Sequence, residues 1–199
     1  MSSFIRLPPD SSGKRIRTVA KTVGGIEVHE QVVQALQADF FATYSAAVVG
    51  STAAADRHHL VIFNGTGSGR IIRILKVVIS CETTAAVTGY AMGFRLRRTA
   101  TAGSGGTSIT VATMDTTDPS LPSAITVWTN PTTAPTLGAV VTVAAINPEE
   151  TGGHYTEVLY ERGQGEKALT LREGEGITVQ QYNNAGAGLI NVYAIFTVE

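Results

Sequence analysis

The stretch "YAMGFRLRRT", residues 90–99, decides the fold because its apolar and polar side chains alternate with a period of two. In an extended chain Met92, Phe94 and Leu96 fall on one face, and the arginines that follow the last two fall on the other. This pattern predicts a β-strand with one buried face and one face in water. The segment "LINVYAIFTVE", residues 189–199, repeats the alternation and predicts a second core strand.

From residue 58 onward the chain consists of short β-rich runs separated by clusters of Gly, Pro, Asn and Asp. One run, "RIIRILKVVIS" (residues 70–80), is apolar on both faces except at Arg73 and Lys76, which is typical of a central strand. About ten such runs in roughly 140 residues indicate two packed sheets. The sequence therefore predicts an all-β protein, a two-sheet β-sandwich of jelly-roll type with an extended N-terminal arm.

Composition divides the chain into three parts. Residues 1–25 carry five cations and one carboxylate with little apolar surface, which predicts an extended basic arm. Residues 26–57 are expected to form a connecting segment, in which residues 29–49 have a spacing compatible with either a short helix or a strand. Residues 58–199 are expected to form the β-sandwich body.

The five cations of the arm are the candidate partner-binding residues. They are Arg6, Lys14, Arg15, Arg17 and Lys21. We expect the arm to become ordered against a neighbouring surface that offers carboxylates and strand edges. A flexible, solvated tail is the alternative, because unanchored chain termini are commonly disordered.

The net charge of −1 conceals an asymmetry between the two halves of the chain. Residues 1–100 hold twelve Lys or Arg against six acids, and residues 101–199 hold three against ten, so the halves carry +6 and −7. If these charges segregate in space, copies of the molecule can meet through opposite patches. If strands from both halves intermix, the asymmetry cancels.

The motif search indicates no enzyme. The glycines of "NGTGSGR" (residues 64–70) resemble a phosphate loop, but the segment lacks a following helix and the GK[ST] ending. Asp115 and Asp118 lie beside a proline in a polar loop, where turn-forming carboxylates are routine, and the same holds for the pair at 149–150. The chain contains neither G-x-S-x-G nor H-E-x-x-H. We therefore expect no catalytic residue and no cofactor.

Histidine and cysteine placement argues against a metal centre. His58 and His59 are adjacent, so in a strand they point to opposite faces and cannot act as a pair of ligands. The single cysteine, Cys81, lies in an apolar run and is expected to be a buried, inert thiol. No metal site is predicted.

Hydropathy and charge bear on location and on two further partner classes. The sequence has no run of eighteen apolar residues and no signal-peptide core, so we expect a protein made in a cytoplasm, without a membrane partner. The basic arm raises the possibility of nucleic-acid binding. The pI of about 6.4 and the scarcity of aromatic residues among the cations argue against it.

Four segments are similar to small structural proteins of tailed bacteriophages: "LPPDSSGKRIRT" (7–18), "GGIEVHEQVV" (24–33), "HHLVIFNGTGSGRIIRILKV" (58–77) and "LTLREGEGITVQQYNNAGAGLINVYAIFTVE" (169–199). The resemblance implies a virion component, either a jelly-roll decoration (cement) protein on the capsid or an accessory part of a tail or head fibre. It also implies a trimer whose terminal arms reach neighbouring subunits and whose partner is the major capsid protein or another virion protein. It implies no catalytic residue.

A receptor- or glycan-binding module is the alternative from another functional class. In that case exposed loops would present Trp128, Tyr155 or Tyr182 as stacking platforms. Core packing is the competing interpretation of Trp128, because tryptophan is highly buried on average.

Overall fold

A computed structural model of the chain describes residues 2–6, 15–23, 26–31, 41–85, 91–147, 154–183 and 188–199, the first three ranges as backbone only. Every regular element in these ranges is a β-strand. The chain forms two compact units, Met1–Gln37 and Ala38–Glu199. The boundary therefore lies within the segment that the sequence assigned to a connection.

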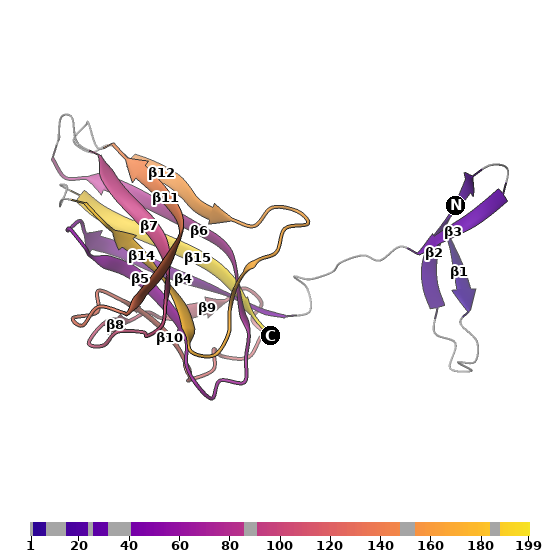
Figure 1. The fold of residues 1–199 in the computed structure, drawn as a ribbon, viewed down its shortest axis with the longest axis horizontal. Helices are drawn as coiled ribbons and strands as arrows, with labels where there is room; N and C mark the ends of the chain where they lie inside the picture. Colours follow the sequence, from indigo (N-terminus) through magenta and orange to yellow (C-terminus); the bar gives the residue numbers. More distant parts are fainter. Residues whose placement is uncertain are drawn as a thin grey trace. The chain divides into compact units, whose positions relative to one another are not determined.

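The N-terminal unit is a three-stranded antiparallel sheet (Figure 1). Its strands are β1 (Ser2–Arg6), β2 (Arg15–Val23) and β3 (Ile26–Gln31). The predicted arm thus has an extended backbone, but its two strands pair with each other, and β2 also pairs with β3. Antiparallel pairing of consecutive strands satisfies backbone N–H and C=O groups where apolar surface is scarce.

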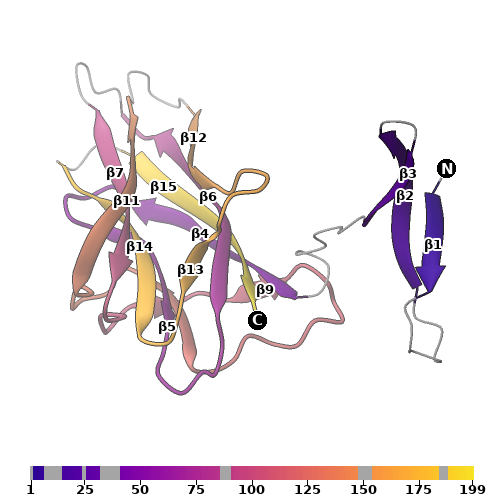
Figure 2. The same ribbon diagram turned by 45° about the vertical axis from the view of Figure 1, so that its right-hand side comes forward.

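The second unit, which we call the body, contains two antiparallel sheets (Figure 2). The first sheet has the order β12-β6-β15-β4-β9, with β13 also pairing with β6. Its strands are β4 (Ala42–Thr52), β6 (Ile72–Thr83), β9 (Val111–Thr113), β12 (His154–Glu161), β13 (Leu169–Leu171) and β15 (Gly188–Val198).

The second sheet has the order β11-β7-β14-β5-β10-β8. Its strands are β5 (His58–Asn64), β7 (Met92–Thr99), β8 (Thr107–Ser108), β10 (Ile125–Thr129), β11 (Leu137–Ile146) and β14 (Glu175–Gln181). Every pairing in the register of this sheet is antiparallel.

The strand pairs of the body are nested in the manner of a jelly roll. The first strand, β4, pairs with the last, β15; then β5 pairs with β14, β6 with β12, and β7 with β11. Strands β8, β9 and β10 are inserted between β7 and β11, and β9 and β10 cover the edges of β4 and β5. The prediction of a two-sheet, jelly-roll-like β-sandwich is confirmed.

Residues 42–52, predicted to be part of a connection, form an internal strand of the first sheet. Tyr44, Ala46 and Val48 are buried in β4, while Ala47 and Val49 between and after them are exposed, so the period is that of a strand. The segment is a strand and not a helix because its backbone pairs with β15 from Ala42 to Thr52, and with β9 from Tyr44 to Ala46.

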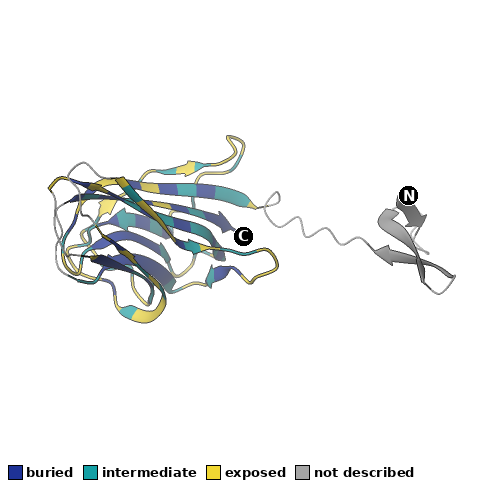
Figure 3. Cartoon of the chain, turned by 90° about the horizontal axis from the view of Figure 1, so that it is seen from above, coloured by how far each residue is buried: buried dark blue, intermediate teal, exposed yellow. Residues whose placement is uncertain are grey.

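The core lies between the two sheets, where Figure 3 shows the buried residues concentrated. Met92, Phe94 and Leu96 are completely buried, as their alternation predicted. On β15 the ring of Phe196 stacks on that of Tyr44 with centroids 5.7 Å apart. The hydroxyl of Tyr44 donates a hydrogen bond to the Pro119 carbonyl oxygen at 2.9 Å, so its polar end is satisfied.

Gly176 on the internal strand β14 tests how tightly the second sheet is packed. A Cβ atom there would lie 2.6 Å from Thr99 Oγ1 and 2.7 Å from the Ile62 carbonyl oxygen. We expect Gly176→Ala to lower the free energy of unfolding by about 1–3 kcal/mol, since neighbouring strands must separate. Denaturant unfolding measures this loss, and an unchanged midpoint would contradict the close approach of the strands.

Candidate functional site

The two adjacent histidines point to opposite faces of β5, as predicted. His58 Nδ1 lies 3.0 Å from Thr178 Oγ1, whereas His59 Nδ1 lies 2.8 Å from Ser51 Oγ. Among the described residues, no group of three or more His, Cys, Asp or Glu side chains is placed to hold a metal ion.

The contact between Ser51 and His59 has the geometry of a nucleophile and its base. Gln181 Oε1 accepts a hydrogen bond from Ala54 N–H at 3.0 Å and lies 3.4 Å from His59 Nε2. With its proton on Nε2, His59 donates to Gln181 Oε1 and can accept at Nδ1 from the Ser51 hydroxyl, which also lies 3.3 Å from its second acceptor, Asn130 Oδ1. Neither the spacing of Ser51 and His59 nor their sequence context indicated this contact.

Burial makes this pair a poor reacting centre. Ser51 is 6% exposed and His59 is completely buried, so no substrate reaches the hydroxyl in this conformation. Desolvation lowers the pKa of His59 to about 4, which makes the imidazole a weak base. We interpret the network as structural, because it satisfies buried polar groups between the sheets.

The glycine-rich loop after β5 binds an anion supplied by the chain itself. The carboxylate of Glu173 accepts hydrogen bonds from Gly69 N–H at 2.5 Å and from Gly67 N–H at 3.4 Å. The amide groups that a phosphate would need are therefore occupied by a side chain from the turn between β13 and β14.

Two further predictions concern single residues of the body. Cys81 is buried, and desolvation raises the pKa of its thiol to about 11, which keeps it protonated and inert.

Asp115 accepts hydrogen bonds from both the N–H and the hydroxyl of Thr117, which lowers the pKa of Asp115, and Asp118 accepts a hydrogen bond from Thr43 N–H. Both aspartates thus act in turns and strand ends; residues 149–150 lie outside the described ranges.

The predicted partner-binding cations belong to the N-terminal unit. Arg15, Arg17 and Lys21 occupy alternate positions of β2, and Arg6 lies opposite Arg15 in the register with β1. These four positions belong to one face of the three-stranded sheet. Lys14 lies outside the described residues.

The charge asymmetry between the two halves of the chain cancels within the body. Strands from both halves are interleaved in each sheet, and ion pairs join cations of the first half to carboxylates of the second. These are Arg73 with Glu199, Lys76 with Glu161 at 3.0 Å, and Arg98 with Glu175 at 3.8 Å. Intermixing, the second of the two alternatives, therefore describes the body.

The three candidate stacking aromatics are engaged within the body. Trp128 donates its indole N–H to the Ala102 carbonyl oxygen at 2.9 Å. The guanidinium of Arg95 lies 3.9 Å from the ring centroid of Tyr182. Tyr155 is half-buried and packs against the core. They lie on or next to three different strands, β10, β14 and β12, and no ring contact among the described residues joins two of them.

An uncovered surface lies where the last strands of the two sheets meet. Strands β11 and β12 lie beside each other there, and each pairs along one edge only among the described residues. We call this surface, made of β11, β12 and the two hollows beside them, the open side. Its exposed apolar residues are Val140, Val141 and Val143 of β11, whereas Val158 of β12 pairs with Val78 and belongs to the outer face of the first sheet.

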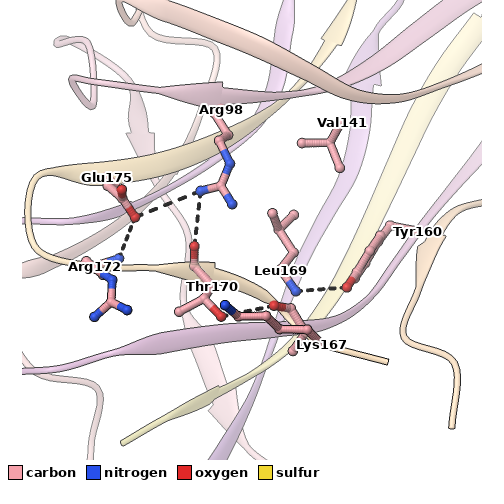
Figure 4. Close-up of a pocket in the computed structure, with 9 residues that line it drawn as sticks. Arg98, Val141, Tyr160, Lys167, Leu169, Thr170, Arg172 and Glu175 are labelled. Atoms are coloured by element: carbon pink, nitrogen blue, oxygen red, sulfur yellow. Dashed lines mark hydrogen bonds and ion pairs between the residues drawn. The ribbon is translucent and has the colours of Figure 1, made fainter. Parts of the chain in front are cut away.

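The first hollow of the open side has a volume of about 520 Å³ and is basic (Figure 4). Its cations are Arg98, Lys167 and Arg172, against one carboxylate, Glu175. Arg98 donates to the Thr170 carbonyl oxygen at 3.1 Å, while neither the Lys167 ammonium nor the Arg172 guanidinium has a partner among the described residues.

The second hollow, of about 350 Å³, lies between β11 and β12. Ala145, Ile146 and Asn147 line it from β11 and the residue that follows, and Tyr155, Thr156 and Glu157 line it from β12. Glu157 is exposed and forms no ion pair among the described residues. The open side is thus basic at one hollow and acidic at the other.

Comparison with family models, curated proteins and solved structures finds no match to this chain. No helix long and apolar enough to cross a membrane occurs in the part of the chain that the structure describes.

Proposed function

We propose that the protein is a non-enzymatic structural component of a virus particle. It acts as a capsid decoration protein in several copies, as a trimer if the phage resemblance holds. The N-terminal unit attaches the protein to the major capsid protein, and the body forms the outer part. The location is the virion, and neither nucleic acid nor a membrane is a partner.

The observation that carries the proposal is the open side of a jelly-roll body. Jelly rolls form capsid and lectin domains, and their function lies in the surfaces they present. Here the polar groups that resemble a catalytic centre or a phosphate loop are engaged within the chain. The three exposed valines on β11 instead make a surface suited to contact with protein.

The N-terminal unit supports the attachment role. It is a compact unit of its own, and four of its cations occupy positions on one face of a three-stranded sheet. Such a face suits an acidic protein surface, where repeated weak contacts add up over many copies. A separate unit for attachment also leaves the body free to contact its neighbours.

Deletion of residues 2–37 tests the attachment role, because it removes the whole N-terminal unit and leaves the body intact. We expect the truncated chain to fold with the circular dichroism of a β protein but to be missing from particles of the virus that encodes it. Mass spectrometry of purified particles, complemented with each variant, measures incorporation.

A second variant keeps the N-terminal unit and changes only its charge. Replacing Arg6, Arg15, Arg17 and Lys21 by Gln retains the strands and is expected to reduce incorporation strongly. Normal incorporation of the truncated chain would reject the role of the N-terminal unit. Absence of the full-length protein from particles would reject the proposed function itself.

A further inference from the structure

We infer that the open side of the body is the contact surface between two copies of this chain, with the acidic hollow of one copy facing the basic hollow of the other. The inference rests on the proposed function in one respect, namely that the protein acts in several copies. It adds the surface, the orientation and the residues of that contact.

The backbone of the open side is the first reason. β11 pairs with β7 and β12 pairs with β6, and neither has a second strand partner among the described residues. At the opposite side of the body, β9 pairs with Tyr44–Ala46 of β4, and β10 pairs with Val61–Asn64 of β5. Among the described residues, β11 and β12 are therefore the longest strands that lack a second strand partner, and their unpaired N–H and C=O groups are a template for another strand.

The side chains of β11 are the second reason. Proteins usually protect an edge strand with charges, prolines or bulges, and the ten residues Leu137–Ile146 contain neither a charge nor a proline. Register shifts disturb the strand on both sides of Val140, but the pairing from Thr142 to Ile146 is regular. This regular stretch carries Val143, which is 60% exposed.

The concentration of exposed apolar residues is the third reason. Eight large apolar side chains of the described residues are exposed, and three of them lie on β11. Val140 and Val143 pair with Arg97 and Arg95 and therefore share the outer face of the second sheet, where they are 44% and 60% exposed. Burying such side chains against a partner removes apolar area from water and favours association.

Charge identifies the partner as a second copy. Lys167 and Arg172 at the basic hollow and Glu157 at the acidic hollow have no ion-pair partner among the described residues. When a second copy approaches in the opposite direction, each acidic hollow faces a basic one, so the same complementarity is used twice. An acidic or a basic peptide would match only one of the two hollows.

Variants in which a charged residue of the open side is replaced by one of opposite charge test the contact. Sedimentation velocity over a range of protein concentrations measures the molar mass, and from it the dissociation constant of the dimer. Glu157→Lys and Lys167→Glu should each raise the dissociation constant about tenfold or more, because each places like charges together. The double variant carries both exchanged charges in every copy, so opposite charges face each other again. Its dissociation constant should lie within about threefold of that of the wild type. Val143→Asp should also raise the dissociation constant by about tenfold or more, since it places a charge in the apolar part.

Arg70→Glu is the matched control, because Arg70 is an exposed cation outside the open side and should leave the mass unchanged. Thermal unfolding of every variant confirms that the body remains folded. A dimer that is weakened by each single exchange and restored by the double exchange supports the inference.

Two outcomes would overturn the inference, and they are distinct from failure of the proposed function. A wild-type chain that is monomeric at all concentrations excludes self-association through the open side, while incorporation into particles is measured separately. An oligomer that is insensitive to both single exchanges and to Val143→Asp shows that copies meet elsewhere.

Discussion

Phe196→Ala lowers the free energy of unfolding of the body by about 3–5 kcal/mol. The ring is completely buried and stacks on Tyr44, and its strand β15 lies between β4 and β6. Truncation removes the contacts of a phenyl ring and leaves a cavity that the two flanking strands, held by their hydrogen bonds, cannot fill. Urea unfolding followed by circular dichroism measures the loss.

Tyr193→Ala is the matched control, because Tyr193 lies on the same strand and is 36% exposed on its outer face. We expect it to lower the free energy of unfolding by about 1 kcal/mol or less. Equal losses for the two variants would mean that the space between the sheets is not the core.

Acidification from pH 7 to pH 4 lowers the free energy of unfolding by about 3 kcal/mol through His59 alone. Burial depresses the pKa of His59 in the folded protein to about 4 from its ordinary value of 6.5. In the window between these values the unfolded chain binds the proton more readily than the folded one. The stability contributed by the neutral imidazole is therefore complete above pH 6.5 and is lost as the pH falls toward 4.

Comparison with His59→Gln isolates this contribution from the carboxylates that titrate in the same range. The free energy of unfolding of each protein is measured at pH 7 and at pH 5, and the decrease should be smaller in the variant by about 2 kcal/mol. In the variant His58 still contributes a smaller decrease in the free energy of unfolding on acidification, because burial lowers the pKa of His58 as well.

The alternation of apolar and polar residues in the sequence was sufficient to predict the two sheets of the body. Alternation at Met92, Phe94 and Leu96 placed these residues in the core, and adjacency placed His58 and His59 on opposite faces. Both features depend only on the period of a β-strand, which the sequence displays directly.

Contacts between segments far apart in the chain could not be predicted from the sequence. The carboxylate of Glu173 binds amides more than a hundred residues away, and Gln181 meets His59 across a similar separation. For a related reason the sequence left residues 29–49 open as helix or strand, since the small residues of β4 suit both until β15 pairs with it. The open side depends on which edges stay uncovered once all strands are in place.

The pairing of β4 with β15 determines when the body can assemble during synthesis. Residues 42–52 acquire this neighbour only after residues 188–198 have left the ribosome, about 150 residues later. At translation rates of about 5–20 residues per second this delay is roughly 7–30 s. During this interval the apolar face of the earlier strand is available to chaperones, because the first sheet closes only after β15 has been synthesised.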